Sequence, residues 1–201
     1  MYHLAQKHFK KTDALLYRAS VLHRIPDVRR SKEVFRDVVH AIVNQQLSGK
    51  AAETIFGRLE ALLGKKKFNA QNVLGLKDAE LRICGLSEAK VKTIHGLAQA
   101  VVRKEIDLVT LHTLPDGEVI TNLTSVKGIG PWTAEMILMF SLGRTDIFSP
   151  GDLGLRKGLM YLYDLKKLPS DAQMKKLTKK WSPYRTYASR VLWRVADARK
   201  K

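Results

Sequence analysis

The amino-acid sequence predicts an all-α protein. Apolar residues recur at intervals of three and four through most of the 201 residues, which is the spacing of one buried helix face. Strand signals are nearly absent, because Val101-Val102 and Leu108-Val109 are too short and no Asn-Gly hairpin occurs. The chain has no repeat of fixed period and no low-complexity segment. We therefore expect about nine or ten helices joined by short links.

Helices in the first half of the chain can be placed from their apolar faces and their capping residues. One runs from about residue 34 and ends near Asn44 to Gln46. Ser48 is a candidate cap for the next helix, which ends at Gly64. A short turn is capped by Asp78 and closes at Gly85, and Ser87 caps a helix that extends to about Val101.

The second half continues the same pattern. Pro115-Asp116 begins a helix, and another follows the glycine-rich turn near residue 130. Asp152 precedes a helix with Leu155, Leu159 and Leu162 on one face. Ser170 caps a segment that extends to Trp181, and Pro183 is at a position typical of the first turn of the last helix.

The charge balance is the most unusual feature of the composition. Lys and Arg number 36 against 19 Asp and Glu, which gives a formal net charge of +17 and an isoelectric point near 10.1. Such an excess favours a polyanionic partner, with nucleic acid first and an anionic membrane surface second. Of the total, +11 lies between Arg156 and the C-terminus.

Several classes of protein are excluded at this stage. The single cysteine, Cys84, rules out an internal disulfide and a site of four thiolates for zinc or iron–sulfur, and is expected to be a small buried hydrophobe. No apolar run approaches 18 residues, so no spanning helix is expected. The first seven residues lack the apolar core of a signal peptide, and an intracellular, reducing compartment is the expectation.

The most informative segment is Leu123 to Ala134, in which two helices are joined by Gly128-Ile129-Gly130. The two glycines permit positive φ and the close approach of another backbone. Pro131 then begins the second helix, whose N-terminal N–H groups suit a phosphate oxygen. Such a contact is independent of base sequence.

Leu123 to Ala134 resembles the hairpin of the helix–hairpin–helix, Gly/Pro, Asp (HhH-GPD) superfamily of DNA glycosylases. Asp146 to Arg156 is similar to the loop of that family that ends in its catalytic aspartate, here Asp152, 20 residues after Trp132. Three further blocks are similar to the 3-methyladenine DNA glycosylase II branch, at residues 42–48, at residues 85–90, and at residues 181–188 with Leu192-Trp193. The resemblance covers about residues 30 to 197.

This resemblance implies two helical lobes with a DNA-binding cleft between them. One lobe would comprise about residues 34–143, with the hairpin, and the other about residues 1–33 and 144–201. The chain departs from bifunctional relatives because Trp132 occupies the position of their lysine, and an indole cannot form a Schiff base. No iron–sulfur cluster and no N-terminal sheet domain are expected, so the chain resembles a minimal, monofunctional form.

Site roles follow from the same resemblance. A target base must leave the helical stack, and a loop residue fills the gap. Gln46 aligns best with that wedge and Leu47 or Ser48 is possible, while Gln45 and Gln46 could instead brace the loop. Trp132 would form one wall of the base pocket, since an indole face attracts a cationic alkylated purine. Met136 occupies a position where some relatives have tyrosine, and Trp193 and Tyr187 are candidates for the opposite wall.

Asp152 is the expected catalytic residue, because a carboxylate stabilises an oxocarbenium-like sugar and orients water. It is also a natural helix cap, and Asp146 and Glu135 are weaker competitors. Phosphate contacts are expected from the hairpin and from one later arginine: Lys127, Gly128, Ile129, Gly130, Trp132, Thr133 and Arg156. Tyr184 and Arg185 are further candidates. The resemblance implies a monovalent cation, Na⁺ or K⁺, on the carbonyls of Thr124, Val126 and Ile129.

The leading hypothesis is a monofunctional DNA glycosylase that removes alkylated purines, chiefly 3-methyladenine, from double-stranded DNA. The alternatives are a glycosylase for uracil, thymine or hypoxanthine in mismatches, or a non-catalytic DNA-binding protein with the same hairpin. No required cofactor and no membrane partner are expected, and the six histidines are scattered singly. A monomer is expected, in the cytoplasm with the nucleoid if the source is bacterial or archaeal, and in the nucleus if it is eukaryotic.

Overall fold

The computed structural model describes residues 1–47 and 49–199, and it is all-helical. Within these ranges there is no strand, as the sequence predicts, and no helix is long and apolar enough to cross a membrane. The chain divides into two compact units, Met1–Arg29 with Gly143–Lys201 (unit 1) and Arg30–Leu142 (unit 2). The sequence placed the corresponding boundaries at residues 33/34 and 143/144.

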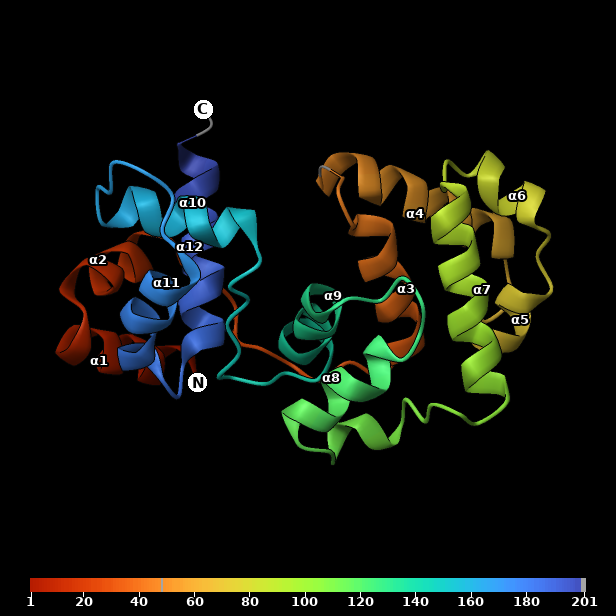
Figure 1. The fold of residues 1–201 in the computed structure, drawn as a ribbon, viewed down its shortest axis with the longest axis horizontal. Coiled ribbons are helices and arrows are strands. Elements are labelled where there is room, and N and C mark those ends of the chain that lie inside the picture. Colours follow the sequence, from red (N-terminus) through yellow and green to blue (C-terminus); the bar gives the residue numbers. More distant parts are fainter. Residues whose placement is uncertain (48, 200–201) are drawn as a thin grey trace. The chain divides into compact units, whose positions relative to one another are not determined.

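Unit 2 contains a continuous stretch of the chain, coloured orange to green in Figure 1. Its elements are α3 (Val34–Asn44), α4 (Gly49–Leu63), α5 (Ala70–Leu74), α6 (Asp78–Ile83), α7 (Glu88–Val102), the 3-10 turn η1 (Thr110–His112), α8 (Asp116–Thr124), α9 (Pro131–Met136) and the π-helical turn η2 (Ile137–Ser141). Helix α3 packs against α4, α7 and α9. The unit is held by fully buried aliphatic side chains, among them Val38, Ile42, Leu59, Ile94, Leu97, Leu123 and Leu138.

Unit 1 combines the two ends of the chain. It consists of α1 (Tyr2–Thr12), α2 (Ala14–Leu22), α10 (Leu153–Leu162), α11 (Asp171–Thr178), the 3-10 turn η3 (Lys179–Trp181) and α12 (Arg185–Ala198). Helix α12 packs against α10 and α2, and α1 contacts η3 (Figure 1). The core joins α1 and α2 to the C-terminal helices through Phe9, Leu16, Leu155, Leu159, Met174, Trp181, Val191 and Leu192.

Capping residues explain where most of these helices begin and end. The Ser87 and Asp152 side chains accept the N–H groups of Lys90 and Leu155, and Ser170 forms a capping box with Gln173. Gly64 and Gly85 adopt φ values of +59° and +106° at the stops that the sequence predicts. The predicted cap of α6 is wrong by one residue, since Lys77 is the N-cap and Asp78 is the first helical residue.

Other parts of the fold also differ from the sequence prediction. Helices α1, α2 and α5 were not assigned, although Asp13 caps α2 by accepting the Leu16 N–H at 3.1 Å and Asn69 caps α5. Pro183 is not in the first turn of the last helix, because α12 begins at Arg185 with Tyr184 as its N-cap. The segment between Trp181 and α12 therefore lies outside the helix.

The buried carboxylate of Asp13 ties the N-terminal helices to the rest of unit 1. Its Oδ2 accepts hydrogen bonds from the Tyr163 hydroxyl and from the Trp181 indole, the latter at 2.8 Å, and Lys180 Nζ lies 3.0 Å away. Burial by itself raises the pKa of Asp13, but these donors outweigh it and hold that pKa below the ordinary 3.8. Burial raises the pKa of Tyr163, and its hydrogen bond to the Asp13 carboxylate raises it further.

Replacing Asp13 with Asn is expected to lower the free energy of unfolding at pH 7 by about 3 kcal/mol, because a charged hydrogen-bond acceptor is lost from a buried site. The folded-state pKa of Asp13 is lowered, so its stabilisation is present above pH 3.8 and lost as the pH falls through the folded value. Urea denaturation at decreasing pH should show the wild type and the variant converging. The exposed Asp164, with φ of +50° that Asn tolerates, provides the control Asp164→Asn; an equal loss in both variants would contradict the assignment.

Candidate active site and nucleic-acid interface

The hairpin predicted at residues 123–134 is present in unit 2 as α8, a six-residue turn and α9. Val126 and Ile129 are buried and anchor the turn, and the Ile129 N–H donates to the Val126 carbonyl at 3.0 Å. Lys127 and Gly128 between them are exposed. The turn therefore faces solvent with one lysine and with main-chain groups.

The two hairpin glycines serve different purposes. Gly128 has a φ of +93°, and a Cβ there would lie 2.0 Å from the Thr93 Oγ1 on α7, so only glycine fits. Gly130 is the N-cap of α9 in extended conformation, with a φ of −96°, and a Cβ there would meet nothing within 4 Å. Positive φ is thus used only at Gly128, and the open space at Gly130 is available to a partner molecule.

The loop after α3 is braced against the hairpin through Gln45. Its side-chain amide donates to the Gly128 carbonyl at 3.1 Å and to the Thr133 Oγ1 at 2.9 Å. Lys90 Nζ on α7 donates to the carbonyls of Val43 and Gln45, both at 2.8 Å, and burial lowers the pKa of Lys90. Of the two alternatives for Gln45, the geometry favours the brace.

The next residues of this loop are the ones presented to solvent. Gln46 is exposed with a φ of +55°, and Leu47 is 38% exposed. Ser48, also a candidate wedge, lies outside the described residues. Thr133 is 1% exposed and its hydroxyl accepts from Gln45, so only its main chain is suited to the predicted phosphate contact.

The residues predicted for one pocket wall lie on α9. Trp132 and Met136 are four positions apart and therefore share one helix face. Trp132 is half-buried and Met136 is 8% exposed. Their role in binding a base stays a prediction.

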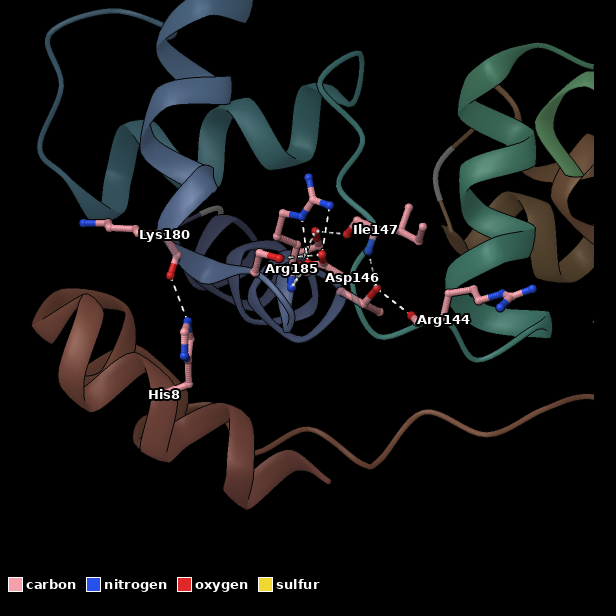
Figure 2. Close-up of polar contacts among 9 residues, drawn as sticks. His8, Arg144, Asp146, Ile147, Lys180 and Arg185 are labelled. Carbon is pink, nitrogen blue, oxygen red and sulfur yellow. Dashed lines mark hydrogen bonds and ion pairs between the residues drawn. The ribbon is translucent and has the colours of Figure 1, made fainter. Parts of the chain in front are cut away.

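In unit 1, the start of the Asp146–Arg156 loop is fixed to the first turn of α12 (Figure 2). Asp146 accepts from Arg185 Nε at 2.7 Å and from Arg185 Nη2 at 3.0 Å, and Ser182 also donates to it at 2.7 Å. The Thr186 hydroxyl donates to the Arg144 carbonyl and accepts the Ile147 N–H. These hydrogen bonds fix the start of the loop against the N-terminal end of α12.

These contacts give Asp146 and Arg185 a structural role. Burial by itself raises the pKa of Asp146. The hydrogen bonds from Arg185 and Ser182, together with the charge of Arg185, outweigh burial and lower this pKa below its ordinary value, so the carboxylate stays ionised. The structure gives no support to Asp146 as an alternative catalytic residue, because its carboxylate is paired with Arg185. The Arg185 guanidinium, a further candidate for phosphate contact, is the group that donates to Asp146.

Asp152 ends the same loop as the N-cap of α10. Its Oδ1 accepts two hydrogen bonds, from the Leu155 N–H at 2.7 Å and from the Trp193 Nε1–H of α12 at 2.9 Å. The carboxylate is thus held by donors from two helices, α10 and α12. Beside it, Gly151 and Leu153 are exposed, so the cap lies at the surface of unit 1.

Two further predicted site residues make intramolecular contacts. Tyr187 has no exposed surface, lies in the core of unit 1, and donates its hydroxyl to Asp27 at 3.2 Å. Arg156 donates to the Pro169 carbonyl at 3.0 Å and pairs with Asp171 at the start of α11. Both contacts join residues far apart in the chain, which helical periodicity does not reveal.

Most of the chain is similar to known proteins. The family model for HhH-GPD superfamily base excision DNA repair proteins matches residues 39–183. DNA-3-methyladenine glycosylase 1 of Schizosaccharomyces pombe is 35% identical over 167 residues, covering 82% of this chain and 73% of that protein. DNA-3-methyladenine glycosylase of Saccharomyces cerevisiae is 34% identical over 201 residues, covering 83% and 68%.

Solved structures agree with the sequence matches. The structure of S. pombe 3-methyladenine DNA glycosylase (Mag1) in complex with abasic DNA aligns with a TM-score of 0.88 and 31% identity, covering 94% of this chain and 95% of that one. The 3-methyladenine glycosidase of Bacillus halodurans aligns with a TM-score of 0.82 and 34% identity, covering 98% and 90%. The chain therefore belongs to the HhH-GPD superfamily of base excision DNA repair proteins.

Proposed function

We propose that this chain is a monofunctional DNA glycosylase that hydrolyses the N-glycosidic bond of alkylated purines, chiefly 3-methyladenine, and leaves an abasic site. The observation that carries the proposal is the carboxylate of Asp152, fixed at the N-terminus of α10. By resemblance, this residue corresponds to the catalytic aspartate of the family. The named relatives, similar over four fifths of the chain, support the choice of substrate.

The charge distribution supports DNA as the substrate. Unit 1 carries 21 Lys and Arg against 7 Asp and Glu, a formal net charge of +14, whereas unit 2 carries +3. Unit 1 would therefore supply most of the attraction to the phosphate backbone and most of its salt dependence. Unit 2 would supply the hairpin grip at Lys127 to Gly130 and the exposed wedge candidates Gln46 and Leu47.

The chemistry needs little more than a placed carboxylate. A 3-alkylated adenine carries positive charge, so when its bond to C1′ breaks it takes the electron pair and leaves as a neutral base. The deoxyribose becomes an oxocarbenium-like cation, and the Asp152 carboxylate stabilises that charge. Water then forms the new bond to C1′ and loses a proton, which the Asp152 carboxylate is suited to accept.

The absence of a Schiff-base route at the hairpin supports a product with an intact strand. Trp132 occupies the position at which bifunctional members have lysine, and its indole nitrogen is not a nucleophile toward C1′. A half-buried indole also suits the face of a cationic purine.

A monovalent cation at the hairpin is part of the proposal. The carbonyl oxygens of Thr124, Val126 and Ile129 form a donor set of oxygens only, which suits Na⁺ or K⁺. The Val126 carbonyl already accepts the Ile129 N–H and keeps a second lone pair. The carbonyls of these three residues would hold the cation, which would supply positive charge for attraction to a DNA phosphate. Among the described residues, no group of three or more His, Cys, Asp or Glu could hold a metal ion.

Base release from methylated DNA tests the catalytic assignment. The wild type should release 3-methyladenine, detected by mass spectrometry, and strand cleavage should require added alkali. Asp152→Asn is expected to slow release at least about tenfold, because charge stabilisation in the transition state is lost. Release that continues at the wild-type rate in this variant would contradict the assignment, and parallel duplexes with hypoxanthine or uracil would reveal the alternative substrate class.

The two hairpin glycines provide a matched pair of substitutions for DNA binding. Gly128→Ala should destabilise unit 2 by about 1–3 kcal/mol, because the new Cβ overlaps Thr93 and the φ is positive. Gly130→Ala should leave the melting temperature unchanged and weaken binding to an abasic duplex, since its methyl group fills the space left for the phosphate backbone. Fluorescence anisotropy and thermal melting measure both quantities. Equal binding by Gly130→Ala and wild type would show that DNA does not approach this glycine.

A further inference from the structure

We infer that Trp193 is a positioning residue that fixes the Asp152 carboxylate, and that Gly154 is glycine in order to admit its indole. The inference rests on the proposed function, because it concerns the orientation of the same carboxylate. It also changes the role expected for Trp193, from a wall of the base pocket to a hydrogen-bond donor.

Two donors from different elements converge on one oxygen. The Leu155 N–H belongs to the first turn of α10 and reaches Asp152 Oδ1 at 2.7 Å. The Trp193 Nε1–H belongs to α12, 41 residues further along the chain, and reaches the same atom at 2.9 Å. A capping bond alone leaves the carboxylate free to tilt, whereas a second donor on a rigid ring fixes its rotation. Such fixed geometry is what a charge-stabilising group requires, since a small displacement has a large effect on rate.

The indole reaches this position only because residue 154 has no side chain. A Cβ on Gly154 would lie 2.8 Å from the Trp193 Cδ1, 3.0 Å from its Nε1 and 3.0 Å from Asp152 Oδ1. Each distance is shorter than an ordinary van der Waals contact, so alanine would push the ring away from the carboxylate. One helical turn later, a Cβ on Gly158 would lie 2.5 Å from the Leu192 carbonyl. The whole glycine face of α10 therefore allows the close approach of α12 that brings Trp193 to Asp152.

A second tryptophan in unit 1 makes the same kind of contact without a role in the proposed reaction. Trp181 is fully buried and donates its Nε1–H to Asp13 Oδ2 at 2.8 Å. Trp181→Phe is thus a matched control for Trp193→Phe, because both remove an indole donor from a carboxylate and keep an aromatic ring.

The test measures single-turnover release of 3-methyladenine at saturating enzyme, together with affinity for an abasic duplex. Trp193→Phe and Gly154→Ala should each lower the rate about tenfold, with affinity changed less than about threefold, since a charged hydrogen bond that fixes the reacting group is lost. Trp181→Phe should lower the melting temperature and leave the rate of the folded protein unchanged. Adding Gly154→Ala to Trp193→Phe should slow release less than Gly154→Ala does in the wild type, because the indole contact is already lost.

An NMR readout tests the contact independently of activity. The three tryptophans give three indole N–H signals, which the Trp→Phe variants assign. Asp152→Asn should shift the Trp193 signal and leave the Trp181 signal in place. Wild-type release rates in both Trp193→Phe and Gly154→Ala, combined with a strong loss in Asp152→Asn, would overturn the inference and leave the proposed function standing. A wild type that releases no base from any alkylated duplex would overturn both.

Discussion

The close packing of α10 against α12 is the constraint on which unit 1 depends. Gly154 and Gly158 lie one turn apart on α10 and remove the side chains that would keep the helices separate. Helix α12 then contacts both ends of the loop at residues 146–152. Its first turn holds Asp146 and the backbone of Arg144 and Ile147, and its middle brings an indole to Asp152. A loop rich in Gly and Pro is in this way fixed at both ends by one helix.

Unit 2 uses helix α7 in a comparable way. Thr93 packs against Gly128 of the hairpin, and Lys90 holds the carbonyls at the end of α3. Gln45 then joins the α3 loop to the hairpin through the Gly128 carbonyl and Thr133. The hairpin and the wedge loop are therefore coupled within one unit, so a grip on phosphate and the insertion of Gln46 or Leu47 would occur in a fixed relation.

The sequence predicted the helices after residue 33, apart from the short α5, and several of their caps, because those signals are local. Asp152 could be found as a cap and, through the resemblance, as the catalytic candidate. Contacts between distant residues were not predictable, since periodicity shows that a face is buried and not what covers it. The core position of Tyr187 and the contacts of Arg156 with Pro169 and Asp171 are of this kind. The hydrogen bond from the Trp193 indole to Asp152 was unpredictable for the same reason, because it depends on the packing of α10 on α12.

The central claim is that Asp152 stabilises a positive charge on the sugar. It is tested most directly by comparing affinity for two duplexes, in which a pyrrolidinium ring or a neutral tetrahydrofuran ring replaces the damaged nucleotide. The wild type should bind the cationic ring at least about tenfold more tightly, since that ring resembles the charged transition state. Asp152→Asn should lose this preference while keeping its affinity for the neutral ring. An unchanged preference in Asp152→Asn, or none in the wild type, would contradict the claim.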